Sequence, residues 1–258
     1  MSGYRLLLFS NSTNYNQPYL EHALPVIRDF LGPAARTVAF VPFAGVTFSY
    51  DEYSHLVSEK FATVGLQIES VHDTADPAKL LRTSDGIAVG GGNTFRLLQR
   101  LYELGLRRAI REAVTGGKPY IGWSAGANIA CPTIRTTNDM PVVEPPSFDA
   151  LDLVPFQINP HYLDAHPEGH QGETREQRLL EFLELNPALT VVGLREGSSL
   201  RVEDDTVSLL GGKTMRLFRT NETPREIGPD QDLSFLLTSP AQQIRPRPGH
   251  PDRPLESA

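Results

Sequence analysis

The fold of this chain is decided by the stretch Pro119-Tyr120-Ile121-Gly122-Trp123-Ser124-Ala125-Gly126-Ala127-Asn128. Its first part, Pro119–Trp123, is a short apolar run typical of a buried strand, and Ala125–Ala130 then has a helical composition. The pattern G-x-S-x-G between them is typical of a sharp turn from a strand into a helix. Such a turn needs very small residues two positions either side of the serine, and Gly122 and Gly126 meet that need.

The same alternation of short apolar runs and amphipathic stretches continues in both directions along the chain. The buried strands that we expect are Arg5–Phe9, Thr37–Pro42, Gln67–Val71, Gly86–Val89, Pro119–Trp123 and Leu189–Leu194. The helices that we expect are Tyr19–Leu31, Asp51–Val64, Asn93–Glu103, Leu106–Val114, Ala125–Ala130 and Glu173–Leu185. Crossovers of this length favour right-handed connections between parallel strands. The pattern therefore predicts an α/β fold around a mostly parallel sheet.

The C-terminal part of the chain has a different pattern. Ser198–Asp204 and Thr206–Leu210 are typical of a hairpin, and Thr214–Arg219 follows as a further strand. We expect an antiparallel appendix to the α/β domain rather than a second domain. From Ser239 onward the chain is rich in proline and charge and has almost no apolar side chains to bury. We therefore expect one domain over 1–238 and a flexible tail over 239–258.

The composition argues against several classes of function. A formal net charge of −7 opposes a nucleic-acid partner, because proteins that bind the phosphate backbone usually carry a basic face. The single cysteine, Cys131, excludes an intrachain disulfide and a thiolate metal cluster, and it favours a reducing compartment. The sequence has neither an export-signal pattern nor the roughly 20 apolar residues of a membrane span. We expect a cytoplasmic protein with no membrane partner.

The turn at 122–126 also suggests a chemistry. In open α/β folds such a turn directs the serine hydroxyl toward the carboxyl end of the sheet, where ligands bind. The amide of Ala125, at the start of the helix, can then donate a hydrogen bond to an oxyanion. We therefore predict that Ser124 is a nucleophile. The alternative is a tight turn whose small residues serve close packing only.

A second glycine-rich turn, Gly90-Gly91-Gly92-Asn93-Thr94, follows the apolar run Ile87–Val89 and precedes a helix. It lacks the spacing of a dinucleotide-binding fingerprint and the Gly-Lys-Ser/Thr of a phosphate-binding loop. Consecutive glycines expose backbone amides and allow another group to approach closely. We predict that Gly91 or Gly92 completes the oxyanion hole. The alternative is a glycine-rich helix start without a catalytic role.

A serine nucleophile needs a base, which is normally a histidine. Among seven histidines we favour His161, because it follows an apolar stretch in Gln157-Ile158-Asn159-Pro160-His161-Tyr162, where a strand-end loop is expected. An alternative is a metal site in a loop, built from His161, His166, His170, Glu168 and Glu173. The spacing of these histidines does not suit one helical face, and Pro160, Pro167 and Gly169 oppose a helix. We expect neither a metal site nor a cofactor.

With these residues identified, the chain resembles the peptidase E family, the α-aspartyl dipeptidases related to cyanophycinases. The resemblance runs from about Leu6 to Thr220 and rests on segments that are specific only in combination. They are Ser10-Asn11-Ser12-Thr13, Pro42-Phe43-Ala44-Gly45-Val46-Thr47, Val89-Gly90-Gly91-Gly92-Asn93-Thr94-Phe95, Ile121-Gly122-Trp123-Ser124-Ala125-Gly126-Ala127-Asn128, Cys131-Pro132-Thr133-Ile134-Arg135-Thr136-Thr137-Asn138-Asp139-Met140, Gln157-Ile158-Asn159-Pro160-His161, Gly172-Glu173-Thr174-Arg175-Glu176-Gln177-Arg178 and Gly193-Leu194-Arg195-Glu196-Gly197. The resemblance implies a flavodoxin-like sheet of the class I glutamine-amidotransferase type, with serine where amidotransferases use cysteine. It also implies metal-free hydrolysis of dipeptides that begin with aspartate.

The resemblance further implies roles for single residues. Ser124 would be the nucleophile, His161 the base, and Asp139 or Glu196 the acid that orients the base. Strand-end geometry favours Glu196, because it follows the apolar run Val191–Leu194 and should project from the carboxyl end of the sheet. The Ser…Asp…His chain order of α/β-hydrolases gives Asp139 only a weak analogy. On the resemblance we prefer Asp139 by a narrow margin and expect Glu196 at the active site as well.

Selection of an amino-terminal aspartate requires a cation for its side chain, and arginine suits a planar carboxylate best. Arg175 is the first candidate and Arg135 the second, and we also expect Asn93 to contact the substrate. The alternative for Arg175 and Arg178 is a solvated helix face with ion pairs to Glu173 and Glu176.

These inferences together predict a serine exopeptidase for short peptides with an amino-terminal aspartate, acting as a monomer or homodimer. Two rival functions stay open. An esterase or thioesterase of the α/β-hydrolase type also uses G-x-S-x-G, although the apolar cap that such enzymes often carry is not apparent. A non-catalytic ligand-binding module could use the same amidotransferase-like fold, although a serine, a histidine and an acid at strand ends argue against it.

Overall fold

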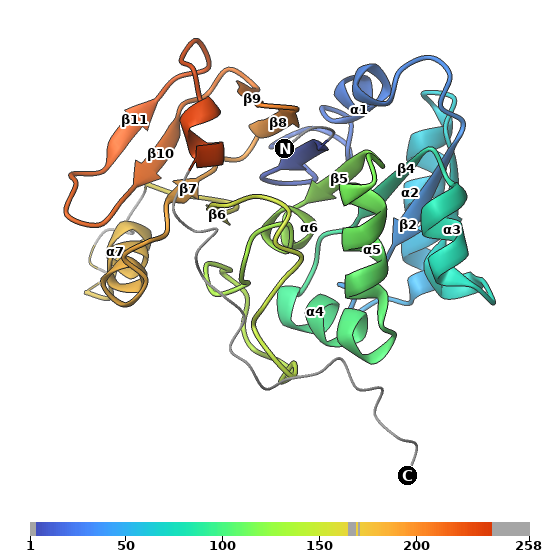
Figure 1. The fold of residues 1–258 in the computed structure, drawn as a ribbon, viewed down its shortest axis with the longest axis horizontal. Coiled ribbons are helices and arrows are strands. Elements are labelled where there is room, and N and C mark those ends of the chain that lie inside the picture. The colour runs from blue at the N-terminus through green and yellow to red at the C-terminus, as the bar shows by residue number, and fades with distance from the viewer. Residues whose placement is uncertain (1–3, 165–168, 170, 239–258) are drawn as a thin grey trace.

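The computed structural model describes residues 4–164, 169 and 171–238, and its centre is a seven-stranded sheet (Figure 1). The strands are β1 (Arg5–Phe9), β2 (Thr37–Val41), β3 (Gln67–Ser70), β4 (Gly86–Val89), β5 (Tyr120–Trp123), β8 (Ser199–Glu203) and β9 (Thr206–Leu210), in the order β3-β2-β4-β5-β1-β8-β9. Strands β1 to β5 are parallel, whereas β8 runs antiparallel to both β1 and β9. The predicted single α/β domain with a mostly parallel sheet is confirmed.

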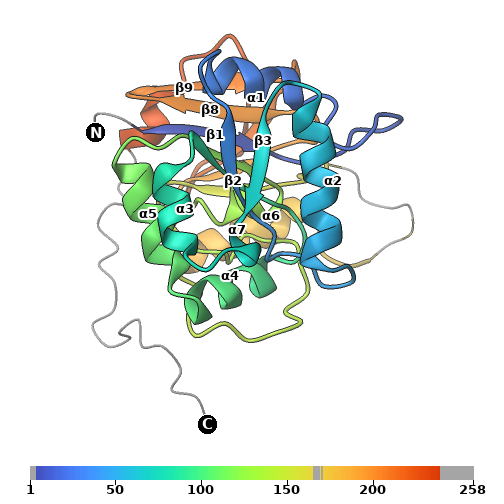
Figure 2. The ribbon, with the colours of Figure 1, turned by 90° about the vertical axis from the view of Figure 1, so that its right-hand side faces the viewer.

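Helices cover both faces of this sheet. They are α1 (Leu24–Leu31), α2 (Tyr50–Ala62), α3 (Pro77–Thr83), α4 (Thr94–Glu103) and α5 (Leu106–Thr115). Successive side chains of a strand point to opposite faces, so Leu6 and Leu8 of β1 pack with α3, α4 and α5. Leu7 and Phe9 point the other way and pack with α1 and α2. Figure 2 shows these two helical layers on either side of the sheet.

A second, four-stranded sheet lies beside the first (Figure 1). Its strands are β6 (Gln157–Asn159), β7 (Val191–Gly193), β10 (Met215–Phe218) and β11 (Arg225–Ile227), in the order β11-β10-β7-β6. Strands β6 and β7 are parallel, and β10 is antiparallel to both β7 and β11. Helix α7 (Arg175–Leu185) shares an apolar cluster with this sheet, in which Leu179 and Leu183 join Val191 and Phe218.

The strand expected over Leu189–Leu194 therefore belongs to the second sheet and not to the main parallel sheet. The reason is the turn that follows it, because this turn sends β8 back along β1. Strand β8 thereby occupies the edge of the main sheet that β7 would otherwise have extended. The expected hairpin is present, but it continues the main sheet. Of the three strands expected in the C-terminal part, the one over Thr214–Arg219 belongs to the second sheet.

Some short elements are not predicted by the sequence analysis, and α3 and β6 are the clearest. Helix α3 has a recognisable start, since the Asp76 side chain accepts a hydrogen bond from the Lys79 amide and Pro77 occupies the first turn. The tail expected over 239–258 lies outside the described residues. Within the described ranges, no helix is long and apolar enough to cross a membrane.

Candidate active site

The sharp turn expected at Ser124 joins β5 to the short helix α6 (Ala125–Asn128). Ser124 has a φ of 54° and a ψ of −112°, a conformation that costs a non-glycine residue about 1–3 kcal/mol. A Cβ at Gly122 would lie 2.3 Å from the carbonyl oxygen of Gly126, and a Cβ at Gly126 would lie 2.1 Å from that of Val89. Both positions therefore require glycine, and their close packing holds the serine in its strained conformation.

Two residues that follow strands of the second sheet form a hydrogen-bonded chain with Ser124. His161 follows β6 and Glu196 follows β7, and the parallel pairing of these strands brings both residues to one end of the sheet. The imidazole Nε2 of His161 lies 2.9 Å from Ser124 Oγ, and its Nδ1 lies 2.6 Å from Glu196 Oε1. Because an ionised carboxylate only accepts hydrogen bonds, Nδ1 carries the proton and Nε2 is free to accept from the serine hydroxyl. The arrangement can activate Ser124 as a nucleophile.

The structure does not place Asp139, the acid preferred on the resemblance, against the imidazole of His161. The Oδ2 atom of Asp139 accepts hydrogen bonds from the Thr94 amide (2.7 Å), the Thr94 hydroxyl (2.6 Å) and the Thr137 hydroxyl (3.1 Å). Among the described residues, no hydrogen bond joins Asp139 to His161. A carboxylate at the first amide of α4 stabilises the start of that helix, so Asp139 secures the glycine-rich turn instead of the imidazole.

Some of the backbone amides around Ser124 donate hydrogen bonds within the fold, and others have no acceptor there. The Ser124 amide donates to Phe9 (3.1 Å), and the amides of Gly90 and Asn93 donate to Val41 and Ala44. Within the described part of the chain, the amides of Ala125, Gly91 and Gly92 have no hydrogen-bond acceptor. A Cβ at Gly91 would lie 3.0 Å from the Ser124 Cβ, so this turn is packed directly against the serine. The three unengaged amides are those predicted to form an oxyanion hole.

Ser10 and Asn11, at the carboxyl end of β1, form hydrogen bonds with the backbone next to the histidine and the glutamate. The buried Ser10 hydroxyl accepts from the His161 amide (2.8 Å) and donates to the Leu194 carbonyl (2.7 Å). The Asn11 Oδ1 atom accepts from the Gly197 amide at 2.8 Å. Both residues belong to the segment Ser10-Asn11-Ser12-Thr13 that carries part of the family resemblance, and no role for them is expected from the sequence. Polar residues directly after an apolar strand are the signal that could have identified them.

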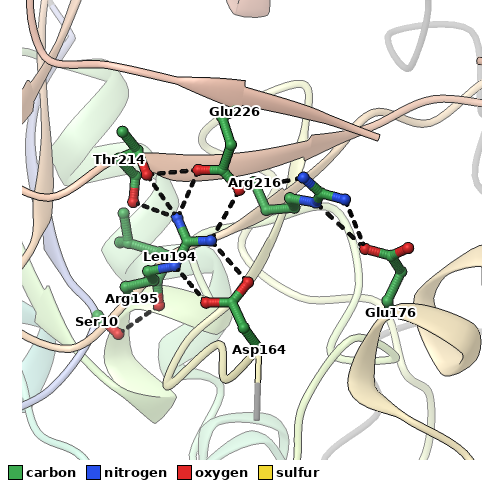
Figure 3. Close-up of polar contacts among 8 residues, drawn as sticks. All are labelled: Ser10, Asp164, Glu176, Leu194, Arg195, Thr214, Arg216 and Glu226. Atoms are coloured by element: carbon green, nitrogen blue, oxygen red, sulfur yellow. Dashed lines mark hydrogen bonds and ion pairs between the residues drawn. The ribbon is translucent and has the colours of Figure 1, made fainter. Parts of the chain in front are cut away.

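An ion-pair network continues from this support toward α7 (Figure 3). Arg195 binds Asp164 through two contacts of 2.7 Å and Glu226 through two of 2.9 Å, and only 16% of its side chain is exposed. Arg216 then bridges Glu226 (3.2 Å) and Glu176 (3.0 Å), the second residue of α7. The network joins the loop after His161 to β11, β10 and the first turn of α7. Bidentate geometry of this kind fixes orientation as well as contributing free energy.

The three residues predicted to bind substrate have different surroundings. Arg175 opens α7, and its Nη1 atom is buried without a hydrogen-bond partner among the described residues. Burial lowers the pKa of Arg175, and the nearby charge of Arg178 adds to this effect. Arg135, in contrast, is bonded to Thr133 and lies over the Phe182 ring at 5.4 Å. A desolvated guanidinium with an unpaired nitrogen is costly, so Arg175 is the better candidate to receive a carboxylate.

Asn93 is occupied by the fold. Its Oδ1 atom accepts from the Arg96 amide as the N-cap of α4, and its Nδ2 atom donates to the Met140 carbonyl at 2.8 Å. These bonds stabilise the glycine-rich turn and leave Asn93 less suited to contact a substrate than expected.

The alternative metal site falls largely outside the described residues, since His166, Glu168 and His170 are not among them. In the described ranges, no group of three or more histidine, cysteine or acidic side chains is arranged to hold a metal ion.

Comparison with known proteins assigns this site to a family. The model of peptidase family S51 matches residues 6–210, which include Ser124, His161 and Glu196. The chain belongs to peptidase family S51. Relatives called peptidase E come from Streptomyces coelicolor (54% identical, over 90% of this chain and 94% of the relative) and a Nostoc strain (50%, over 90% and 96%). A third, from Salmonella typhimurium, is 51% identical over 84% of this chain and 94% of its own length.

Solved structures share the fold of this S51 family member. A peptidase from an acI-B1 Actinobacterium superimposes with a TM-score of 0.68 at 15% identity, covering 91% of this chain and 99% of the other. A putative peptidase E from Listeria monocytogenes has a TM-score of 0.61 at 24% identity, covering 81% and 99%. At these identities the likeness concerns the architecture alone.

Proposed function

We propose that this S51 family member is a serine exopeptidase that hydrolyses dipeptides and very short peptides with an amino-terminal aspartate. The observation that carries the proposal is the continuous chain of hydrogen bonds from Glu196 through His161 to Ser124. The unengaged amides beside Ser124 support it further. The name peptidase E, borne by relatives that are at least half identical in sequence, supports the peptidase class of the proposed reaction.

The proposed reaction proceeds in two steps. Ser124 Oγ attacks the carbonyl carbon of the aspartyl residue while His161 Nε2 takes the hydroxyl proton, and Glu196 stabilises the imidazolium. The amides of Ala125 and the Gly91–Gly92 turn stabilise the oxyanion, and His161 gives its proton to the leaving amine. Water, deprotonated by His161, then attacks the acyl-enzyme and releases aspartate. Each oxyanion donor contributes about 3 kcal/mol to lowering the barrier.

Arg175 is the proposed binding site for the aspartate side chain. Arg178 pairs with Glu173 at 3.6 Å, and Glu176 pairs with Arg216, so neither acid occupies Arg175. A glutamate substrate would place its carboxylate one methylene further out, and asparagine would lack the charge.

A dipeptide library tests the proposed specificity. We expect Asp-Leu to be cleaved far faster than Glu-Leu or Asn-Leu, and p-nitrophenyl esters to be poor substrates. Arg175→Met should lower kcat/KM for Asp-Leu about 10- to 100-fold, the loss typical of a charge-assisted hydrogen bond. Arg178→Met is the matched control on the same helix and should stay within about twofold of wild type. Preference for apolar amino-terminal residues, or for esters, would contradict the proposal.

We further propose that the enzyme works in the cytoplasm without a metal or cofactor, as a monomer or homodimer. The free and buried Cys131 supports a reducing compartment. Activity should survive prolonged treatment with a chelator. A loss of activity that added zinc restores would contradict the metal-free mechanism.

A further inference from the structure

The hydroxyl of Tyr53, on α2, connects the nucleophile turn with the glycine-rich turn. Only 5% of Tyr53 is exposed, and its hydroxyl donates to the Gly91 carbonyl at 3.0 Å. The same oxygen accepts from Trp123 Nε1 and from the Tyr19 hydroxyl, each at 3.1 Å. One donated and two accepted bonds use the full capacity of a phenol. Burial raises the pKa of Tyr53 to about 12, so the hydroxyl keeps its proton in neutral solution.

The aromatic ring of Tyr53 is held in one position. The rings of Phe40 and Phe48 meet it edge to face, each with 5.1 Å between ring centroids. A Cβ at Gly90 would lie 2.5 Å from the Tyr53 oxygen, so the glycine-rich turn rests directly on the phenol. The hydroxyl is therefore a fixed point beneath that turn.

The bond to the Gly91 carbonyl has a consequence for the next amide. The peptide between Gly91 and Gly92 is planar and trans, so its N–H points away from its C=O. Holding the carbonyl against Tyr53 therefore directs the Gly92 amide to the opposite side. The Gly92 amide has no acceptor in the described part of the chain. The preceding residue, Gly91, is packed against Ser124. Three glycines in succession would otherwise allow this peptide to rotate.

We propose that Tyr53 is a positioning residue that holds the Gly91–Gly92 peptide so that the Gly92 amide can stabilise the oxyanion. The Tyr53 hydroxyl does not itself touch the reacting atoms. This inference rests on the proposed serine peptidase function. It adds that a buried phenol on α2, a helix that covers the main sheet, contributes to transition-state stabilisation.

Tyr53→Phe removes one oxygen and keeps the ring, so it isolates this role. We expect kcat for Asp-Leu to fall about tenfold, a fraction of the loss caused by deleting an oxyanion donor, with KM within about twofold. The inhibition constant of the boronic acid analogue of aspartate, which forms a tetrahedral adduct with serine, should rise by a similar factor. Tyr19→Phe is the matched control, because it removes a hydroxyl from the same cluster without touching the turn. It should leave both quantities within about twofold.

The outcomes separate this inference from the proposed function. A kcat of Tyr53→Phe within twofold of wild type, or an equal loss in Tyr19→Phe, would overturn the role of Tyr53 while the proposed function stands. Failure of the wild-type protein to cleave Asp-Leu would overturn the proposed function itself. If Tyr53→Phe does not fold, the double variant with Tyr19→Phe removes one unpaired donor, and the same tenfold loss in kcat is expected of it.

Discussion

Ser124 and His161 share a property that few residues have. Both carry a positive φ, 54° for the serine and 52° for the histidine. Such a conformation costs about 1–3 kcal/mol and persists only where surrounding contacts impose it. The Ser124 amide donates to Phe9 and the His161 amide donates to Ser10, so residues at the carboxyl end of β1 hold both. The two groups are aimed at each other by the backbone as well as by their side chains.

The support by Ser10 leads to a prediction for single substitutions. Ser10→Ala should lower kcat about 10- to 100-fold with little change in KM, because loss of the bond to the His161 amide lets the imidazole drift. Ser198→Ala is the matched control, since Ser198 is equally buried and its hydroxyl has no partner among the described residues. Steady-state kinetics on Asp-Leu measure both variants. Equal losses in the two would rule out a specific role for Ser10.

The orienting acid is tested by amide substitutions. Glu196→Gln should lower kcat by about four decades, because an amide stabilises the wrong imidazole tautomer and no imidazolium. Asp139→Asn keeps an acceptor for the Thr94 amide and should cost less than about tenfold in kcat. Kinetics of both variants at one pH decide between the acids. The larger loss in Asp139→Asn would restore Asp139 as the partner of His161.

Parts of the site could be predicted from the sequence. Ser124 and the Gly91–Gly92 turn follow from local patterns, because small residues at fixed spacing are needed wherever the backbone bends so sharply. Between Asp139 and Glu196, the local argument from the strand end favours Glu196, and only the family resemblance favours Asp139. Asp139 lies in a long irregular loop, and its position against Thr94 depends on how that loop folds over α4.

At the level of elements, the first turn of α7 connects specificity to the ion-pair network. Glu176 binds Arg216, and the neighbouring Arg175 is the proposed aspartate ligand. Glu176→Gln should therefore raise KM for Asp-Leu several-fold with a smaller change in kcat. The reason is that the first turn of α7, which carries Arg175, loses its ion pair with Arg216. Arg225→Gln, which alters an exposed pair on β11, should leave KM unchanged. An unaltered KM in Glu176→Gln would show that α7 is positioned by other contacts.

The strands of the main sheet were easier to predict than those of the second sheet. Strands β1, β2, β4 and β5 are apolar runs buried on both faces, which is a strong signal. Strands β6 and β7 have three residues each, and a run that short has no reliable pattern. Which sheet they join depends on a distant contact, the pairing of β8 with the edge of β1. For this reason the sequence pattern predicts the strand near Val191 in the main sheet, whereas the structure has it in the second sheet.

At the scale of the whole molecule, the site spans two sheets. The main sheet supplies Ser124, and the second supplies His161 and Glu196. The alignment of the nucleophile with its base therefore depends on how the sheets are fixed to each other. Ser10 crosses this boundary from β1, and the network around Arg195 stiffens the second sheet behind it (Figure 3).

We expect low pH to weaken the ion-pair network around Arg195. The hydrogen bond from Arg195 is the main cause that lowers the pKa of Glu226 from 4.5 to about 2. Because the folded-state pKa lies below the unfolded value, the carboxylate stabilises the fold fully above pH 4.5 and loses this contribution as the pH falls toward 2. Glu226→Gln should lower Tm at pH 7 and shrink the difference in Tm between pH 7 and pH 3. Thermal unfolding at both pH values measures this, and a difference equal to that of wild type would contradict it.

The decisive experiment for the proposed mechanism is the turnover of Asp-Leu by the Ser124→Ala variant, with circular dichroism to verify that it is folded. The substitution removes one oxygen from a half-buried turn, so the fold should be retained. Loss of a serine nucleophile lowers kcat by about six decades in comparable enzymes, so we predict no measurable turnover. A folded Ser124→Ala protein that keeps more than about a thousandth of the wild-type rate would show that another group is the nucleophile.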